Sequence, residues 1–181
     1  MDNTDSGVSA AGGDDSNAGD NVPLFVYGTL MEDKVLHALL DRVPSTKKAC
    51  LSGFHRYRIK DHVFPAIRPR EGGSVEGLFM TGLNAREKLI FDLFEDDDYF
   101  KQEVEVKVEG RDDDIRTAVC YVWNASAEYQ LYETWDPSVH FTEEVHVPDY
   151  VTMVEGFVEY INEEGLLLDE EAPDATAAAA V

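Results

Sequence analysis

Apolar residues recur along this chain at the two spacings that distinguish strands from helices. Apolar–polar alternation, or a short unbroken apolar run, is typical of a strand, and apolar residues three and four apart are typical of an amphipathic helix. The strand patterns cover residues 24–26, 49–60, 74–83, 104–108 and 117–123. The helical patterns cover residues 33–43, 84–95 and 150–163. Several strands with few, scattered helices predict an α+β fold, and favour a small mixed β-barrel with flanking helices.

Polar and turn residues mark where these elements begin and end. Asp33 is expected to cap the first helix, and Pro44 to stop it. Asn84 is expected to open the second helix, because Glu87 three residues later completes a capping-box pattern. The connections predicted between strands are a mixed loop at residues 61–71 and turns at residues 72–73 and 110–114.

The two ends of the chain lack an apolar pattern that could pack. Residues 1–21 are rich in Asp, Gly, Ser, Ala and Asn, and residues 166–181 are acidic and Ala-rich. Such segments bury too little apolar surface to offset the entropy of ordering. The sequence therefore predicts two disordered tails around one domain of residues 22–165.

Charge and cysteine content narrow the classes of function. The chain has 15 Lys and Arg against 37 Asp and Glu, a formal net charge of −22. Such a chain should repel nucleic acid and anionic membranes, and this acidity disfavours polyanionic substrates. Cys50 and Cys120 are too few for a disulfide framework and are expected to be reduced. With no signal-peptide or membrane-spanning pattern, the expected location is cytoplasmic.

Residues 26–30, Val-Tyr-Gly-Thr-Leu, form the most informative segment of the chain. They end a buried strand at Gly28, where the missing Cβ would let a ligand approach outward-facing backbone N–H groups. On that interpretation this segment binds a ligand. The alternative is an ordinary turn that terminates the strand.

Glu95 is a candidate general base. It lies at the end of the predicted second helix, where the negative end of the helix dipole disfavours a carboxylate. Asp96, Asp97 and Asp98 follow directly, so like charge and partial burial are both expected to raise its pKa toward neutrality. A general base needs a pKa near the working pH. The alternative is a solvated acidic helix end.

Other polar clusters give weaker signals. The histidines, which show no metal-binding spacing, are His37, His55, His62, His140 and His146. Asp112–Asp114 lacks the alternation and glycine of a calcium loop. No nucleophile elbow, P-loop or dinucleotide fingerprint occurs. A local basic cluster could balance the acidic surface or anchor a substrate carboxylate, and its members are Arg56, Arg58, Arg68 and Arg70.

Four segments, in this order, resemble the gamma-glutamylcyclotransferase-like superfamily, and within it the plant-type avirulence-induced-gene-like proteins. They are LFVYGTLM from residue 24, LSGFHRYRIKDHVFPAIRP from residue 51, VEGLFMTGL from residue 75 and LFEDDDYFKQEVEV from residue 93. The resemblance implies a small β-barrel with helices around it and a cavity at one end. It also implies that the α-amine of a γ-glutamyl group attacks its own γ-carbonyl, which gives 5-oxoproline and a free amine. The implied reaction needs no metal or organic cofactor.

The same resemblance implies roles for individual residues. Glu95 falls on the catalytic glutamate, which takes a proton from the α-ammonium. Tyr27, Gly28, Thr29 and Leu30 fall on the loop that holds the γ-glutamyl group, and Tyr99 on a further substrate-binding position. Members of the family often have Arg shortly after that tyrosine. This chain departs from the pattern, because Phe100-Lys101-Gln102 follow Tyr99.

Two further interpretations remain beside a γ-glutamyl cyclotransferase. The chain could be a non-catalytic binding protein that keeps the fold. It could also remove a γ-glutamyl group from an acylated small molecule in a biosynthetic pathway. Retention of Glu95 together with Tyr27 and Gly28 argues against the non-catalytic alternative, because a cavity used only for binding need not keep the base.

Overall fold

The computed structural model describes residues 22–110, 114–124 and 130–167. Most of both predicted tails therefore lies outside the described residues, as do Asp112 and Asp113. In chain order the elements are β1 (Leu24–Val26), η1 (Thr29–Met31), α1 (Asp33–Leu40), β2 (Ser45–Ile59), β3 (Pro65–Thr81), α2 (Ala85–Glu95), η2 (Asp96–Asp98), β4 (Tyr99–Val108), β5 (Ile115–Trp123), β6 (Leu131–Thr134), α3 (Pro137–His140) and α4 (Val147–Glu163).

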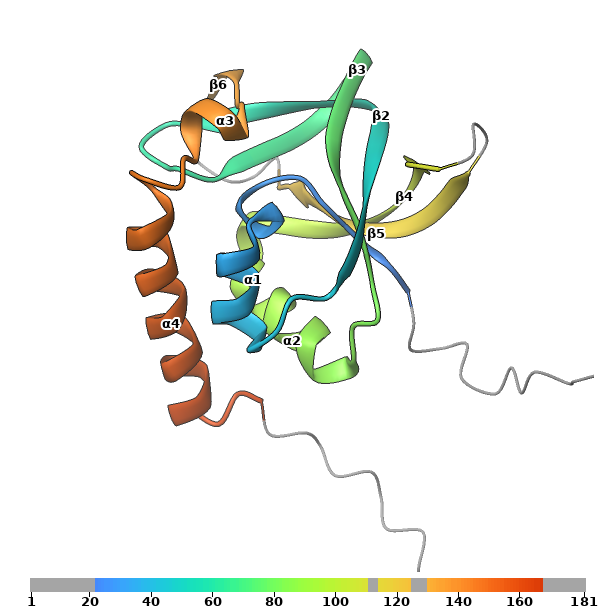
Figure 1. The fold of residues 1–181 in the computed structure, drawn as a ribbon. Coiled ribbons are helices and arrows are strands. Elements are labelled where there is room, and N and C mark those ends of the chain that lie inside the picture. The colour runs from blue at the N-terminus through green and yellow to red at the C-terminus, as the bar shows by residue number, and fades with distance from the viewer. Residues whose placement is uncertain (1–21, 111–113, 125–129, 168–181) are drawn as a thin grey trace, which may run out of the picture.

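Five strands close into a mixed β-barrel with helices beside it, which confirms the predicted α+β fold (Figure 1). The strands pair in the order β3-β1-β5-β4-β2, and β2 pairs again with β3 to complete the circle. Among the strand pairs of the described residues, only β1 and β5 run parallel, and β6 extends the barrel from β2. Apolar residues from all five strands fill the interior, among them Phe25, Leu51, Ile67, Val106 and Val122.

The predicted loop at residues 61–71 and turn at residues 72–73 are wrong from residue 65 onward. Residues 65–81 form one continuous strand, which pairs with β2 almost from end to end. Gly72 and Gly73 lie in a bulge opposite Gly53, not in a turn between two strands. A Cβ on Gly73 would come within 2.3 Å of the Phe54 carbonyl oxygen, so the close approach of the strands requires glycine here. The pair of glycines bends a strand without ending it.

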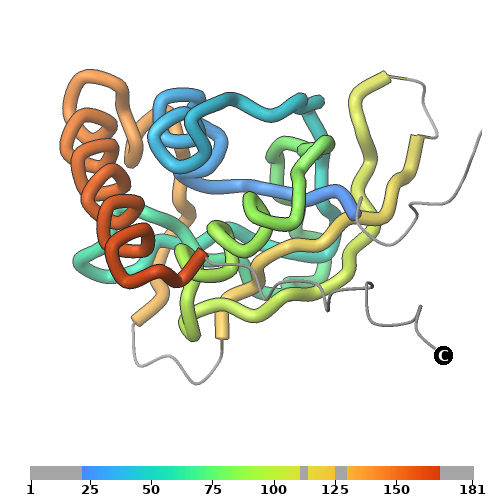
Figure 2. Tube along the Cα trace, turned by 90° about the horizontal axis from the view of Figure 1, so that it is seen from below, coloured from blue at the N-terminus to red at the C-terminus, as the bar shows by residue number. Residues whose placement is uncertain are grey.

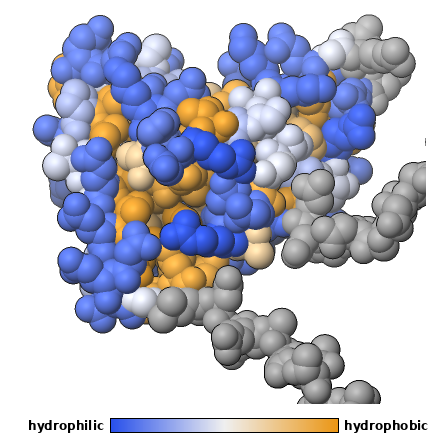
Figure 3. All heavy atoms as spheres, turned by 60° about the horizontal axis from the view of Figure 1, so that its bottom comes forward, coloured by the Kyte–Doolittle hydropathy of each residue, from blue (hydrophilic) through white to orange (hydrophobic). Residues whose placement is uncertain are grey.

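Helices α1, α2 and α4 cover one side of the barrel, and both ribbon views place α4 beside α1 (Figures 1 and 2). Outward-facing residues of β1 and β3 pack under them, with Leu24, Val26 and Met80 buried in the same core as Leu36 and Val154. On this helical side, seen from below, apolar side chains form a band bordered by hydrophilic ones (Figure 3). The barrel interior and the helical side thus hold separate apolar cores.

The ends of two predicted helices need correction. Glu32, not Asp33, is the N-cap of α1, and its side chain accepts a hydrogen bond from the Lys34 N–H. The helix ends at Leu40, so Val43 is exposed instead of lying on the apolar face. Helix α4 begins at Val147, three residues before the predicted start.

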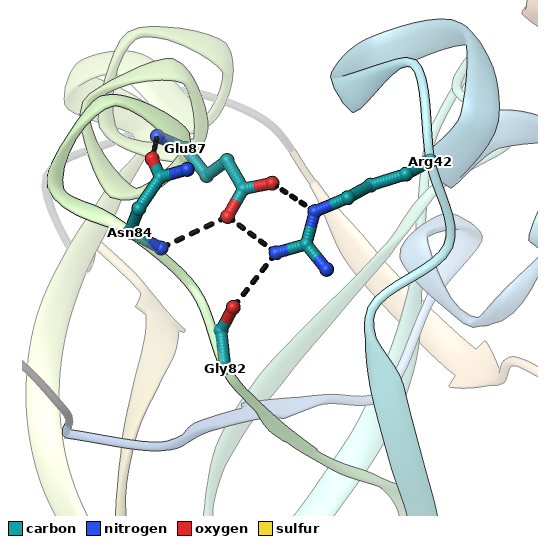
Figure 4. A network of polar contacts seen from close by, with 4 residues as sticks. All are labelled: Arg42, Gly82, Asn84 and Glu87. Carbon is teal, nitrogen blue, oxygen red and sulfur yellow. Dashed lines mark hydrogen bonds and ion pairs between the residues drawn. The ribbon is translucent and has the colours of Figure 1, made fainter.

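The start of α2 is fixed by the predicted capping box and by one distant arginine (Figure 4). The Glu87 N–H donates to Asn84 Oδ1 and the Asn84 N–H donates to Glu87 Oε2, each at 2.9 Å. Arg42 then donates two hydrogen bonds to the buried Glu87 carboxylate, and a further one to the Gly82 carbonyl at 2.7 Å. This network holds the start of α2 against the segment that joins α1 to β2. The far end of the same helix carries Glu95.

Candidate active site

A cavity of about 280 Å³ opens at one end of the barrel, where β1 ends and β3 and β4 begin. Strand pairing places the end of β1 near the start of β4, because β1 runs parallel to β5, which is antiparallel to β4. The start of β3 joins them through Pro65, whose carbonyl oxygen accepts a hydrogen bond from Tyr99 at 2.8 Å. The described residues that line the cavity are Phe25, Val26, Tyr27, Gly28, Thr29, Leu30, Phe64, Pro65, Phe94, Glu95, Asp96, Asp98, Tyr99, Tyr121, Tyr150, Met153 and Phe157.

All the site residues predicted from the sequence line this one cavity. They come from the segment after β1, from the end of α2 and from the start of β4, and they are Tyr27, Gly28, Thr29, Leu30, Glu95 and Tyr99. The structure therefore brings together residues that are up to 72 positions apart in the sequence. Their roles in binding and catalysis stay predictions.

The Glu95 carboxyl group lines this cavity and has a strongly shifted pKa. Burial raises the pKa of Glu95 from 4.5 to about 8. The Glu95 carboxylate makes no hydrogen bond or ion pair with any other described residue. The like-charge effect expected from Asp96, Asp97 and Asp98 does not contribute, because burial alone accounts for the shift. Asp96 and Asp97 are exposed to solvent instead.

The turn after β1 is held in place on two sides. A Cβ on Gly28 would lie 2.8 Å from Cγ and Cδ of Pro65, so glycine is required here by the neighbouring ring. Gly28 then caps the short helix η1, with the Met31 N–H donating to its carbonyl oxygen at 3.0 Å. The N–H groups of Thr29 and Leu30, in the first turn, have no acceptor within this helix. The turn thus presents donors beside the cavity that Glu95 lines.

Arg56 fixes the other side of this turn and was assigned no such role from the sequence. Its guanidinium donates to the carbonyl oxygens of Tyr27 and Glu76, at 2.5 and 3.2 Å, and lies 5.0 Å from the ring centroid of Trp135. Arg56 is therefore a positioning residue rather than a substrate anchor. Neither Arg56 nor Arg58, which pairs with Glu133, lines the cavity. In the sequence, Arg56 is only an arginine within a predicted strand. Residue spacing does not reveal that it contacts the Tyr27 carbonyl oxygen.

Three tyrosine hydroxyls of the cavity donate hydrogen bonds to other groups of the protein. Tyr27 donates to the Tyr121 carbonyl oxygen at 2.7 Å, and Tyr99 donates to the Pro65 carbonyl oxygen at 2.8 Å. Tyr121 donates to Asp92 Oδ1 at 2.6 Å. Burial raises the pKa of all three hydroxyls, so they stay protonated at neutral pH.

Tyr150 differs from these three. Its hydroxyl accepts a hydrogen bond from Thr29 Oγ1 at 3.0 Å, which leaves its own proton for an acceptor in the cavity. Tyr150 comes from α4, so the last helix contributes to a cavity otherwise built by the barrel and α2. The sequence pattern did not reveal this role, because Tyr150 enters it only as the first residue of the predicted helix.

Lys101 does not reach the cavity. Its ammonium pairs with Asp92 Oδ2 at 2.8 Å, and Asp92 in turn accepts the Tyr121 hydroxyl bond. Lys101 lies where the family often has arginine, and it therefore supports the Tyr121 hydroxyl through Asp92 without lining the cavity itself.

Neither a metal site nor a membrane-spanning helix is found in the part of the chain that the structure describes. Across residues 22–110, 114–124 and 130–167, no cluster of three His, Cys, Asp or Glu side chains could hold a metal ion. Within the same ranges, no helix has the length and apolar character needed to cross a bilayer. Cys50 and Cys120 are both free thiols.

The family model for "Gamma-glutamyl cyclotransferase, AIG2-like" matches residues 24–138, which hold the barrel, α2 and most of the cavity. The chain therefore belongs to this family, and the resemblance described from its motifs is confirmed. The match ends before α4, which supplies Tyr150, Met153 and Phe157 to the cavity.

Individual relatives agree with this assignment. AIG2-like protein D of Arabidopsis thaliana is 37% identical over 141 residues, which are 77% of this chain and 90% of that protein. AIG2-like protein C of the same plant is 38% identical over 138 residues, 75% of this chain and 77% of that protein.

Solved structures agree on the fold. A solution structure of an Arabidopsis thaliana protein is 26% identical with a TM-score of 0.59, covering 83% of this chain and 97% of its own. A solved gamma-glutamyl cyclotransferase is 15% identical with a TM-score of 0.53, covering 88% and 94%, and this likeness is one of fold alone.

Proposed function

We propose that this protein is a γ-glutamyl cyclotransferase. In the reaction, the α-amine nitrogen of a γ-glutamyl group attacks the γ-carbonyl carbon of the same group. A new C–N bond closes the ring of 5-oxoproline, the γ-amide C–N bond breaks, and the leaving amine takes up a proton. The reaction balances without a redox partner. Glu95 would accept the α-ammonium proton and later return it to the leaving amine.

The observation that carries this proposal is the pKa of Glu95, about 8. An α-amine titrates at about 7.7–8.0, so the donor and the acceptor of the proton are nearly matched. An ordinary glutamate, at about 4.3, would make the same transfer unfavourable by ~5 kcal/mol. Burial of Glu95 therefore removes most of the thermodynamic barrier to forming a nucleophilic amine.

The rest of the cavity supports binding and orientation. The N–H groups at the start of η1 suit the substrate α-carboxylate, and the Tyr150 hydroxyl suits the γ-carbonyl oxygen on which charge develops. Because nucleophile and carbonyl belong to one molecule, the enzyme has only to fold the substrate into the cyclising conformation. Arg56 and Pro65, which hold the turn from behind, keep these donors fixed.

The test is formation of 5-oxoproline by the purified full chain. It would be incubated with glutathione, a γ-glutamyl amino acid, γ-glutamyl-ε-lysine and a γ-glutamyl alkylamine, with 5-oxoproline measured by mass spectrometry. The Glu95→Gln variant sets the background. Release from at least one compound, dependent on Glu95, is expected. Saturable binding of these compounds without release would favour the non-catalytic alternative. Release from none of them, but from another small molecule acylated with a γ-glutamyl group, would favour the biosynthetic one.

A further inference from the structure

One wall of the cavity is apolar and comes mainly from α4, outside the residues that match the family model. Phe157 packs edge-on against Phe94, with ring centroids 5.2 Å apart, and Phe94 also meets Tyr150 at 6.5 Å. Phe94 directly precedes Glu95, so this aromatic wall begins beside the candidate base. Met153 is 46% exposed while lining the cavity, which places it at the mouth.

The charges around the cavity are all negative among its described lining residues. Asp96 and Asp98 contribute the negative charge, since the raised pKa of Glu95 keeps that group mostly protonated at neutral pH, and no Lys, Arg or His is present in this lining. Outside the described residues the sequence holds one basic side chain, Arg111. The residue before it, Gly110, follows the end of β4 opposite to Tyr99. A carboxylate on the far end of a substrate would therefore meet like charge without a cationic partner.

In a substrate bound through its γ-glutamyl group, the leaving nitrogen stays within reach of Glu95, and the substituent on that nitrogen must extend away from the β1 turn, toward the mouth. Along that path it meets Phe94, Phe157 and Met153. A cationic leaving group could approach Asp96, which is exposed, or Asp98, which is partly exposed, and ion pairs that solvent reaches contribute little. Contact with the uncovered aromatic and thioether surface is the stronger effect.

We propose, resting on the proposed function, that α4 forms a leaving-group subsite for an uncharged, apolar amine. Phe157 and Met153 determine this specificity, together with Phe94 from α2. The substrate class is then a γ-glutamyl amide of an apolar monoamine, in preference to a γ-glutamyl amino acid or a γ-glutamyl diamine.

Three synthetic substrates test this proposal directly. γ-Glutamyl-phenethylamide and γ-glutamyl-phenylalanine differ only in the leaving-group carboxylate, and γ-glutamyl-1,4-diaminobutane adds a cation to an alkyl chain. We expect kcat/KM for the phenethylamide to exceed that for each of the others by at least ~10-fold, the size of a modest pocket discrimination. A preference for the carboxylate or for the diamine would overturn the subsite while leaving cyclotransferase activity intact.

Met153→Lys sharpens the test, because it places a cation at the mouth. It should narrow the preference for the phenethylamide over γ-glutamyl-phenylalanine roughly 2- to 5-fold, the range for one partly exposed ion pair. Tyr160→Lys is the matched control, since Tyr160 is 56% exposed on the same helix and does not line the cavity. Equal effects of the two substitutions would show that net charge, not the subsite, sets the preference.

Calorimetric binding of the same three compounds separates this proposal from the proposed function. If none yields 5-oxoproline but the phenethylamide binds tightest, the function fails and the subsite stands. If none yields product and the three bind equally or not at all, both fail.

Discussion

The two ends of α2 each carry a glutamate that is at least partly buried, and the protein treats them in opposite ways. Glu87, at the start, accepts two hydrogen bonds from Arg42 and one from the Asn84 N–H (Figure 4). Burial alone would raise the pKa of Glu87, but the bonds from Arg42 and Asn84 outweigh it, and the pKa is lowered. Glu95, at the end, makes no such bond with the described residues, and its pKa rises to about 8.

This contrast separates a carboxylate that stabilises the fold from one that is left without partners among the described residues, as the role proposed for Glu95 requires. The fold can supply partners for a buried acid, as Glu87 shows. Leaving Glu95 without them is unfavourable for stability, and such exceptions concentrate at functional sites. The partners of Glu87 also fix the start of the helix whose other end presents Glu95 to the cavity.

The largest expected effect is on turnover. Glu95→Gln keeps the shape of the side chain and removes its basicity, so kcat should fall at least ~10²-fold, the lower end for losing a general acid or base. Substrate affinity should change much less, because the β1 turn is expected to hold the γ-glutamyl group. Steady-state release of 5-oxoproline measures both.

Two controls belong to that experiment. Asp97→Asn changes an exposed neighbour and Glu87→Gln changes the other end of α2, and each should retain most of the activity. If Asp97→Asn lost as much as Glu95→Gln, the acidic run as a whole would matter. Glu95 would then have no special role.

The sequence predicted only part of the contrast between the two ends of α2. The capping box was predicted correctly because Asn84 and Glu87 are three residues apart, and a helix brings such pairs together by its own geometry. Arg42 lies 45 residues from Glu87, and only the tertiary fold shows that they meet. For Glu95 the direction of the pKa shift was predicted, but like charge from the aspartates was wrongly included among its causes.

The same limit applies to the barrel and the cavity. Short apolar runs predicted most strands, but the pairing of β2 with β3 through the Gly72–Gly73 bulge overrides the local turn signal of two glycines. The cavity residues on the family motifs could be named in advance. Arg56 and Tyr150 could not, because each acts across the fold, on the Tyr27 carbonyl and the Thr29 hydroxyl.

A second expected effect concerns stability against pH. The folded pKa of Glu95 is raised, so between about pH 4.5 and 8 the folded state holds a proton that the unfolded state has lost. The contribution of Glu95 to the stability of the parent protein therefore falls as pH rises through this window. Glu95→Gln removes this titrating group, so the variant should be more stable than the parent by ~2 kcal/mol at pH 8. This is less than the free energy that corresponds to the whole pKa shift, because the cavity is open to water.

Urea unfolding at pH 5, 6.5 and 8 measures this difference. Other titrating groups cancel when the variant is compared with its parent at each pH, and Asp97→Asn should follow the parent throughout. A difference that stays constant over this range would mean that Glu95 titrates like an ordinary carboxyl group. The proton matching proposed for catalysis would then be lost as well.

The smallest expected effect comes from the start of α2 and has the opposite sign. Glu87→Gln weakens the bonds from Arg42, which is itself 44% exposed in its side chain and can regain water. We expect a loss of about 1 kcal/mol at pH 7, a fall in Tm of roughly 2–4 °C for a chain of this size.

Because the folded pKa of Glu87 is lowered, its contribution to stability is present above the unfolded pKa and fades as pH falls through the folded pKa. The penalty of Glu87→Gln should therefore shrink toward acid pH, whereas the gain of Glu95→Gln grows toward alkaline pH. Glu105→Gln, on the exposed face of β4, should move Tm very little. A folded Glu87→Gln protein that lost turnover as Glu95→Gln does would show that the two ends of α2 act as one unit.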